Sequence, residues 1–207
     1  RSTTPAGTTV TVPPSHMALY QYAYNDNISY QWFAPAGLTR GVVQNATSVG
    51  YLTTEGEFKA ISLTQGQRDA MYTDKLNPIT TFPGQGTIVF GQKTLQKKKS
   101  ALDRVNVRRL LIDLKKFLGD QAKSLVFEQN TIATRNTFLS NVNPYLESIQ
   151  QRQGLYAFRV KMDETNNTPD VIDRNIMVGE IFLQPAKTAE FIVLDFNVLP
   201  TGAAFPE

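Results

Sequence analysis

The sequence predicts an α/β fold of the α+β sandwich kind, in which helices flank a mixed sheet and the chain closes on an antiparallel hairpin and an extended tail. Three observations favour this class. Apolar residues recur at helical spacing over residues 103–127 and 132–153, and from Leu155 onward they alternate with a period of two. The chain has 207 residues, 41% of them hydrophobic, which is enough to bury a substantial core.

Domain organisation follows from composition. Residues 1–14 are rich in Ser, Thr and Pro and begin with Arg rather than Met, so we expect a linker from an upstream part of a longer polypeptide. We expect residues 15–199 to form the core domain and residues 200–207 an extended terminal arm. No long uncharged apolar window and no signal-like start occur in the sequence, so no membrane insertion is expected.

The first part of the chain predicts short elements. Ser15 can cap a helix over residues 16–26, and we favour a helix there although the tyrosines alternate as in a strand. Residues 42–53 and 57–63 read as a strand pair because Thr, Glu and Gly between them form turns.

A second helix is indicated by Thr64 and Gln67, which have the spacing of a capping box and open residues 65–76. A glycine-rich turn then leads into a buried strand, Thr87–Phe90. Its glycines lack the G-x-G-x-x-G pattern and precede a strand rather than a helix, so a tight turn is favoured over a phosphate site.

The strongest helical pattern covers residues 103–127, with Ser100 or Asp103 as the cap. One face of this helix is apolar and another is cationic. The next helix, residues 132–153, contains Pro144, which we expect to kink it.

The last part of the chain predicts strands over residues 155–162, 176–183 and 190–199. A short turn joins the second and third, so we expect them to form an antiparallel hairpin. The final strand and its apolar tail favour pairing with another chain.

Few catalytic chemistries fit the composition. The chain has no cysteine and one histidine, His16, which removes Cys/His zinc sites, thiol nucleophiles and disulfide frameworks. A Ser-His-Asp site would have to use His16 directly after Ser15, where a capping role is favoured. We therefore expect no enzyme and no cofactor.

Residues 161–175 are rich in carboxylates and amides, which makes them a candidate ligand site. With Asp163 as the first ligand of a calcium loop, Thr168 stands in place of the required glycine and Arg174 in place of the bidentate acid. The carboxylates have no fixed separation for acid catalysis. A Thr-Pro-Asp start instead predicts a short helix over residues 169–175, and no metal is expected.

Positive charge is concentrated in one segment. Residues 97–123 contain nine Lys and Arg against three acids, which gives +6, whereas the whole chain carries +3 and the remainder therefore −3. This asymmetry indicates an acidic partner: a protein, a nucleic acid or a neighbouring copy of the chain. The aromatic residues mostly have core-like spacing, which disfavours nucleic acid. The basic face comprises Lys97, Lys98, Lys99, Arg104, Arg108, Arg109, Lys115, Lys116 and Lys123.

Several segments, in order, resemble the carboxy-terminal part of the contractile tail sheath proteins of bacteriophages. Each motif is modest alone, but their shared order is specific, and the resemblance covers nearly everything from Val12 to Phe196. Thr131 and Met162 depart from the family pattern. The matching segments are VPPS, APAGLTRG, LNPITTFPGQGTIVFGQKTL, DRVNVRRLLIDLKK, VFEQN, MDETNNTPDVIDRN and the stretch from Pro185 to Ile192.

The resemblance implies a structural subunit that polymerises as a helical sleeve around a tail tube and contracts to drive the tube through the host envelope. The alternatives are the sheath of a phage-like injection system, such as a pyocin or type VI secretion, and a nucleic-acid-binding module that uses helix 103–127. The implied partners are the protein itself, the tail tube protein, and baseplate and neck proteins, with no nucleic acid expected. The implied location is the virion tail, assembled in the host cytoplasm.

The resemblance also implies two contact regions. The basic face would contact the tube or an adjacent subunit, with the helix around residues 135–152 as the second candidate for the tube. A strand-exchange segment near the chain end would add a strand to a sheet of a neighbouring subunit. We name as this exchange segment Glu190, Phe191, Ile192, Val193, Leu194, Asp195 and Phe196.

Overall fold

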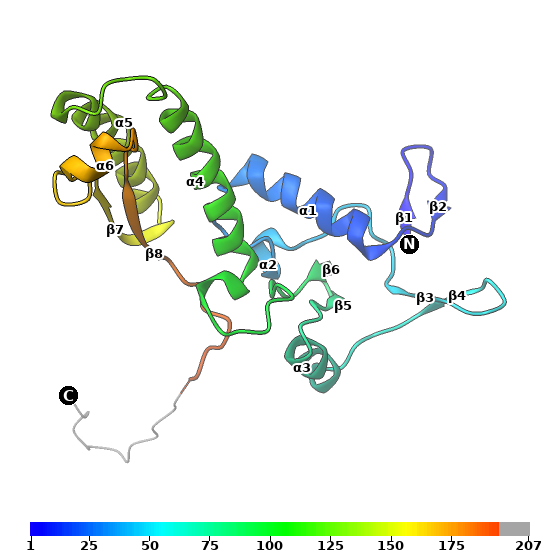
Figure 1. Ribbon diagram of the computed structural model, residues 1–207. Helices are drawn as coiled ribbons and strands as arrows, with labels where there is room; N and C mark the ends of the chain where they lie inside the picture. Colours follow the sequence, from blue (N-terminus) through cyan, green and yellow to red (C-terminus); the bar gives the residue numbers. More distant parts are fainter. Residues whose placement is uncertain (195–207) are drawn as a thin grey trace, which may run out of the picture.

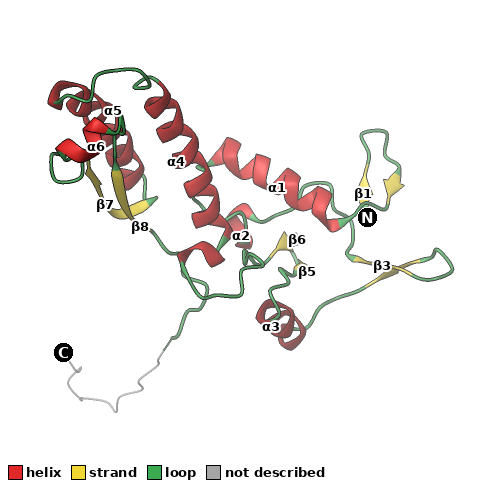
Figure 2. Ribbon diagram, viewed as in Figure 1, coloured by secondary structure: helices red, strands yellow, loops and turns green. Residues whose placement is uncertain are grey.

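The computed structural model describes residues 1–194. The predicted α+β mixture of helices and strands is confirmed (Figures 1 and 2), but in place of the expected mixed sheet the described residues form small antiparallel sheets. The helices are α1 (Pro14–Ile28), α2 (Gly37–Arg40), α3 (Gln65–Thr73), the 3₁₀ turn η1 (Ala101–Asp103), α4 (Val105–Lys123), α5 (Ile132–Gln151) and α6 (Pro169–Asp173). The strands are β1 (Ser2–Thr3), β2 (Thr9–Val10), β3 (Gly50–Leu52), β4 (Phe58–Ala60), β5 (Ile79–Phe82), β6 (Gly86–Val89), β7 (Leu155–Lys161) and β8 (Glu180–Pro185).

Within residues 1–194 the strands pair as four separate two-stranded antiparallel ladders, β1–β2, β3–β4, β5–β6 and β7–β8. Figure 1 shows α4, α5, α6, β7 and β8 gathered in one lobe, whereas β1 to β4 extend from the opposite end of the molecule. Each ladder keeps outer edges that are not paired with another named strand among the described residues.

The main core lies in the lobe of α4, α5 and β7. Leu110 and Leu114 from α4 pack with Val142, Leu146 and Ile149 from α5, and all five side chains are buried. This confirms the apolar faces predicted for the two long helices. Trp32, which follows α1, also enters this core, and its indole Nε1 donates to the carbonyl oxygen of Arg152 at 2.9 Å. The N-terminal half is thereby tied to the end of α5.

The first helix confirms the preference for helix over strand, but its start differs from the prediction. Pro13 occupies the N-cap position and Pro14 the first helical position, so Ser15 lies inside α1 rather than capping it. Proline is well suited to this place because it lacks the N–H that would be unsatisfied there and its φ is already helical.

The capping box of α3 is confirmed. The Thr64 hydroxyl accepts from the Gln67 N–H at 3.4 Å, and the Gln67 side chain accepts from the Thr64 N–H at 2.9 Å. In the following hairpin, Gly84 and Gly86 have φ of 74° and 85°, which confirms the tight turn. β5, the first strand of this hairpin, was not predicted from the sequence.

The two long helices lie close to their predicted ranges. α4 begins at Val105, after η1, whose start is capped by the Ser100 hydroxyl accepting from the Leu102 N–H at 3.2 Å. It ends at Lys123, four residues earlier than predicted. α5 contains Pro144 and continues through it as one helix to Gln151.

The predicted hairpin between residues 176–183 and 190–199 is wrong over the described residues. β8 pairs instead with β7, from Lys161 opposite Glu180 to Leu155 opposite Pro185. The reason is burial: Ile181 and Leu183 of β8 pack against the core beside β7. Residues 186–194 form no strand, and residues 195–199 lie outside the described part of the chain.

Candidate functional site

Three cations of the predicted basic face form an exposed stripe on α4. Arg108, Lys115 and Lys116 are all exposed, and their spacing of seven and eight residues places them along one side of the helix. Ile112 lies on the same side and is also exposed. We call Arg108, Lys115 and Lys116 the basic stripe.

Two other predicted cations are held by carboxylates within the chain. The Arg109 guanidinium donates to both carboxylate oxygens of Asp26, at 2.7 and 2.6 Å, and lies over the ring of Tyr22. This contact fastens α4 to α1. Arg104 is paired with Glu190 and Asp103. Arg109 and Arg104 therefore form ion pairs within the subunit, and the positions of charges along the sequence do not reveal these pairs.

The remaining predicted cations are solvent-exposed. Lys97, Lys98 and Lys99 lie in the exposed loop before η1. Lys123, at the end of α4, pairs with Asp120 at 3.0 Å, an exposed contact of the kind that contributes little stability.

A polar cluster holds the beginning of the exchange segment. The Nε of Arg104 donates to Oε1 of Glu190 at 2.6 Å, and its NH2 donates to Oε2 at 3.0 Å. The buried amide of Gln92 donates to the Thr188 hydroxyl at 2.6 Å. Burial, and then the hydrogen bond and charge of Glu190, raise the pKa of the Tyr72 hydroxyl well above its usual value. Loop 92–94, the start of α4 and the end of α3 meet here.

Immediately after this cluster the chain exposes a run of apolar side chains. Phe191, Ile192, Val193 and Leu194 are between 70% and 92% exposed. They are extended from the lobe of β7 and β8 (Figure 1). Asp195 and Phe196, which the sequence analysis included in the exchange segment, lie outside the described residues.

The arginines of α5 and its C-cap have partners within the subunit. Arg135 is buried, and its NH1 donates to Oδ1 of Asn130 at 2.8 Å. Arg152 lies over the ring of Tyr30, 5.2 Å from its centroid. Arg135 therefore has a role inside the subunit, whereas Arg152 remains exposed at the end of the helix.

The carboxylate-rich stretch 161–175 folds as a structural loop. Asn167 is only 2% exposed, and its side chain accepts from the Val178 N–H at 2.8 Å and donates to the carbonyls of Val178 and Asp163 at 2.9 and 3.1 Å. The Thr165 hydroxyl donates to Asp163 and, with the Thr165 N–H, lowers the pKa of that carboxyl. The described residues contain no group of three or more His, Cys, Asp or Glu placed to hold a metal ion.

The short helix predicted in this stretch is confirmed as α6, with Thr168 at the N-cap position. The Thr168 side chain makes no cap hydrogen bond in the structure. The sequence pattern predicts only turn positions for the asparagines. The central role of Asn167 was missed because its partner Val178 is eleven residues away along the chain.

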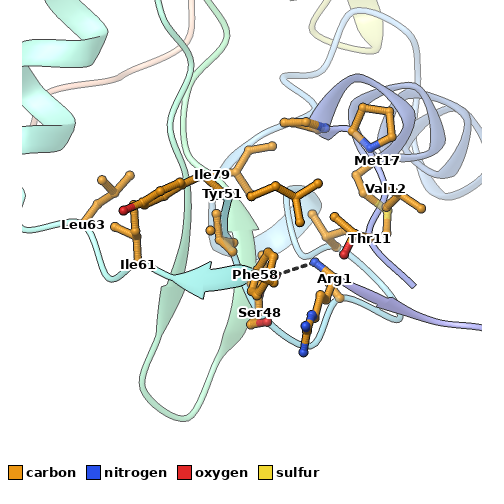
Figure 3. A pocket seen from close by; sticks show the side chains of 18 of the residues that line it. Arg1, Thr11, Val12, Met17, Ser48, Tyr51, Phe58, Ile61, Leu63 and Ile79 are labelled. Carbon is orange, nitrogen blue, oxygen red and sulfur yellow. Dashed lines mark hydrogen bonds between the residues drawn. The ribbon is translucent and has the colours of Figure 1, made fainter. Parts of the chain in front are cut away.

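The opposite end of the molecule contains an apolar pocket of about 620 Å³ (Figure 3). It is enclosed by the first residues of the chain, the entry to α1, and strands β3, β4 and β5. Arg1 lies on its wall, where the α-amino group donates to the carbonyl of Ser48 at 2.8 Å (Figure 3). Most of the lining side chains are apolar, among them Val12, Met17 and Phe58.

Across residues 1–194, none of the helices combines the length and the apolar character needed to cross a bilayer.

The sequence of the chain is similar to those of known proteins. Residues 97–199 match the family model for the phage tail sheath C-terminal domain. The tail sheath protein of Vibrio phage KVP40 is 43% identical over 185 residues, which cover 89% of this chain and 26% of the relative. The tail sheath protein of Enterobacteria phage T4 is 40% identical over 185 residues, covering 89% of this chain and 27% of the relative. The chain thus spans about a quarter of the length of these curated relatives.

Solved structures show the same similarity in three dimensions. A chain in the baseplate of the anti-feeding prophage matches with a TM-score of 0.77 and 25% identity, over 95% of this chain and 52% of that chain. A chain in the contracted sheath complex of the extracellular contractile injection system PVC matches with a TM-score of 0.76 and 26% identity, over 91% of this chain and 52% of that chain.

Proposed function

The chain belongs to the phage tail sheath family, and on this premise we propose that it is part of the structural subunit of a contractile tail sheath. The subunit polymerises as a helical sleeve around a tail tube, and contraction of the sleeve drives the tube through the host envelope. Its partners are then further copies of itself, the tail tube protein, and baseplate and neck proteins. Its place is the virion tail, assembled in the host cytoplasm. Membership of a structural family supports a role without enzymatic activity.

The main support for this proposal is that the range matched by the family model includes the exposed residues proposed for contacts. The matched range, 97–199, contains both the basic stripe on α4 and the exchange segment. A sheath within a phage-like injection system is the second candidate, because the similar solved structures come from such systems. Electron microscopy of particles from the source, with labelled antibodies against the chain, distinguishes a phage tail attached to a capsid from a free injection particle.

We propose residues 15–199 as the core domain, residues 1–14 as the connection to a preceding part and residues 200–207 as the terminal arm. The β1–β2 hairpin within the first fourteen residues is tied to the following segment, because the Thr3 N–H donates to the carbonyl of Asn45 at 3.0 Å.

The exchange segment is proposed to add a strand to a sheet of a neighbouring subunit. Four consecutive apolar side chains, Phe191 to Leu194, are exposed and extended, and exposing them to water is unfavourable unless a partner covers them. Two-stranded ladders such as β7–β8 can accept a further strand through backbone hydrogen bonds along an outer edge. A head-to-tail contact of this kind generates helical polymers when it does not close into a ring.

Deletion of residues 189–207 from the protein expressed from its whole gene tests this exchange. We expect the truncated protein to remain folded and to form no sleeves by negative-stain microscopy. A sharper variant is Val193→Pro, which removes one backbone N–H from the segment, with Val193→Ala as its control. We expect the proline variant to polymerise less than the alanine variant, and normal sleeves from the deletion would refute the exchange.

The basic stripe is proposed to contact an acidic surface of the tail tube. Arg108, Lys115 and Lys116 present three positive charges on one side of α4. Complementary charge accelerates and orients association, and its contribution falls as salt screens it.

Reversal of the stripe with Arg108→Glu, Lys115→Glu and Lys116→Glu is expected to weaken tube binding strongly, and more at low salt than at high salt. For a matched change in net charge, the pair Lys115→Glu and Lys116→Glu is compared with Lys59→Glu and Arg159→Glu, two cations exposed elsewhere. Cosedimentation with purified tubes measures the effect. Equal binding by both pairs would show that the stripe faces another surface, and a salt-sensitive gel shift with nucleic acid would favour that class of partner.

A further inference from the structure

The exchange segment leaves the core at a sharply defined point. At Glu190 the side chain is 15% exposed and is held by Arg104, whose own side chain is 25% exposed. At the next residue, Phe191, the exposed fraction rises to 77%. The change from a largely buried to a largely exposed side chain therefore falls between two consecutive residues.

The contact at this boundary is geometrically specific. Two guanidinium nitrogens of Arg104 donate to the two carboxylate oxygens of Glu190, at 2.6 and 3.0 Å, which is the paired arrangement that fixes both side chains in one orientation. Asp103 lies 3.1 Å from the third guanidinium nitrogen and holds it from the other side. Arg104 is also the N-cap residue of α4, so the pair is fixed to the longest helix of the basic face.

A second contact holds Thr188, two residues before Glu190. The buried Gln92 amide donates to the Thr188 hydroxyl at 2.6 Å, and the backbone carbonyl of Gln92 accepts from the Val105 N–H at 2.8 Å. Two residues before Thr188, the Ala186 N–H continues the β7–β8 ladder to the carbonyl of Gly154 at 3.1 Å. Residues 186–190 are thus attached to three parts of the core without being a strand.

From these contacts we propose that the Arg104–Glu190 pair is a clamp that fixes where and in which direction the exchange segment leaves its own subunit. This inference rests on the proposed strand exchange. A segment held at its base samples fewer conformations before it meets a neighbour, so less entropy is lost on pairing and its effective concentration at the acceptor rises. Arg104 is then a positioning residue for assembly and not a residue of the basic contact surface.

Limited trypsin digestion of the soluble subunit tests the clamp without requiring assembly. Lys187 is the only Lys or Arg after Arg174, so cleavage there removes residues 188–207 as a single mass loss. It is exposed, but its neighbours Ala186 and Thr188 are both hydrogen-bonded to the core. Cleavage then depends on transient release of this stretch.

Glu190→Gln and Arg104→Gln are expected to speed cleavage after Lys187 by about tenfold, the lower range for hydrogen bonds to a charged group because the pair is partly exposed. Arg109→Gln is the matched control, since it breaks another arginine–carboxylate contact of α4, to Asp26 of α1, in which the exchange segment takes no part. High salt should speed cleavage of the unaltered chain and leave Glu190→Gln unaffected. Equal cleavage rates in all three variants would overturn the clamp.

The protein concentration needed for assembly distinguishes a positioning contact from one that only stabilises the fold. If the clamp positions the segment, Glu190→Gln should raise the protein concentration needed for sleeve formation while the urea midpoint stays close to that of Arg109→Gln. Arg104→Lys, which keeps the charge but not the fork, should give an intermediate effect. Faster cleavage with unchanged assembly would overturn the positioning role. Sleeves from the protein lacking residues 189–207 would instead refute the exchange itself.

Discussion

Replacing Asn167 with alanine should lower the free energy of unfolding by about 2 to 3 kcal/mol. The side chain makes three hydrogen bonds to backbone groups, two to Val178 and one to Asp163. A hydrogen bond contributes about 1 kcal/mol net, and an orphaned buried group costs more. Val178 is only partly buried, so water can replace some of the lost partners, which keeps the expected loss near the sum of three ordinary bonds.

Urea denaturation followed by circular dichroism measures this loss as a shift of the midpoint at constant slope. Asn141→Ala is the matched control, because Asn141 is exposed on α5 and alanine favours a helix there slightly. For a chain of this length the Asn167 variant should also melt lower by roughly 4 to 12 °C.

Asn167→Asp sharpens the test. A carboxylate at this position can still accept from the Val178 N–H, but it faces the carbonyl oxygens of Val178 and Asp163, to which the amide had donated. We expect this variant to be at least as unstable as Asn167→Ala at neutral pH and to recover partly in acid, where the carboxyl can donate. A loss under about 0.5 kcal/mol in Asn167→Ala would refute the structural role of the loop.

Three further predictions concern the core. Burial and the hydrogen bond to Asp113 raise the pKa of Tyr145 to about 12, so the folded chain keeps a phenol proton that the unfolded chain loses near pH 10. The free energy of unfolding should therefore fall between about pH 10 and 12, and fall less steeply in Tyr145→Phe. Urea titrations at several pH values measure this difference. Leu114→Ala empties a fully buried site and should cost about 2 to 5 kcal/mol by the same assay, a value under 1 kcal/mol contradicting the packing. Gly154→Ala would bring a Cβ within 2.5 Å of Ile149 and should cost about 1 to 3 kcal/mol in melting experiments, whereas an unchanged melting point would show that the contact relaxes.

The helices α4 and α5 and the capping box at Thr64 could be predicted because short-range sequence patterns determine them. The apolar residues of α4 and α5 recur with the helical period, and the capping box at Thr64 depends on residues only three positions apart. These features were identified from the sequence because their physical causes lie within one or two turns of the chain.

Strand pairing was harder because alternation states which residues share a face but not which strand lies beside them. Residues 180–185 satisfy the pattern for pairing with either neighbour. The choice of β7 is made by burial of Ile181 and Leu183 and by the loop that Asn167 closes.

The basic face was predicted as one set of cations. The structure divides that set into cations paired within the subunit and cations that are exposed. Arg104 and Arg109 reach carboxylates 86 and 83 residues away, so no local spacing could mark them as paired. The exposed residues Arg108, Lys115 and Lys116 were identifiable from the helical wheel, and their role at a tube stays a prediction.

The way the exchange segment joins β8 determines how a tensile load would enter the subunit. β8 ends at Pro185, opposite Leu155, the first residue of β7, so a pull on the chain beyond it would peel the ladder open one residue pair at a time from that end. The Arg104–Glu190 pair lies between the pulling point and the ladder. Force would therefore pass first into the 19-residue helix α4. The open end of the β7–β8 ladder would be shielded from it.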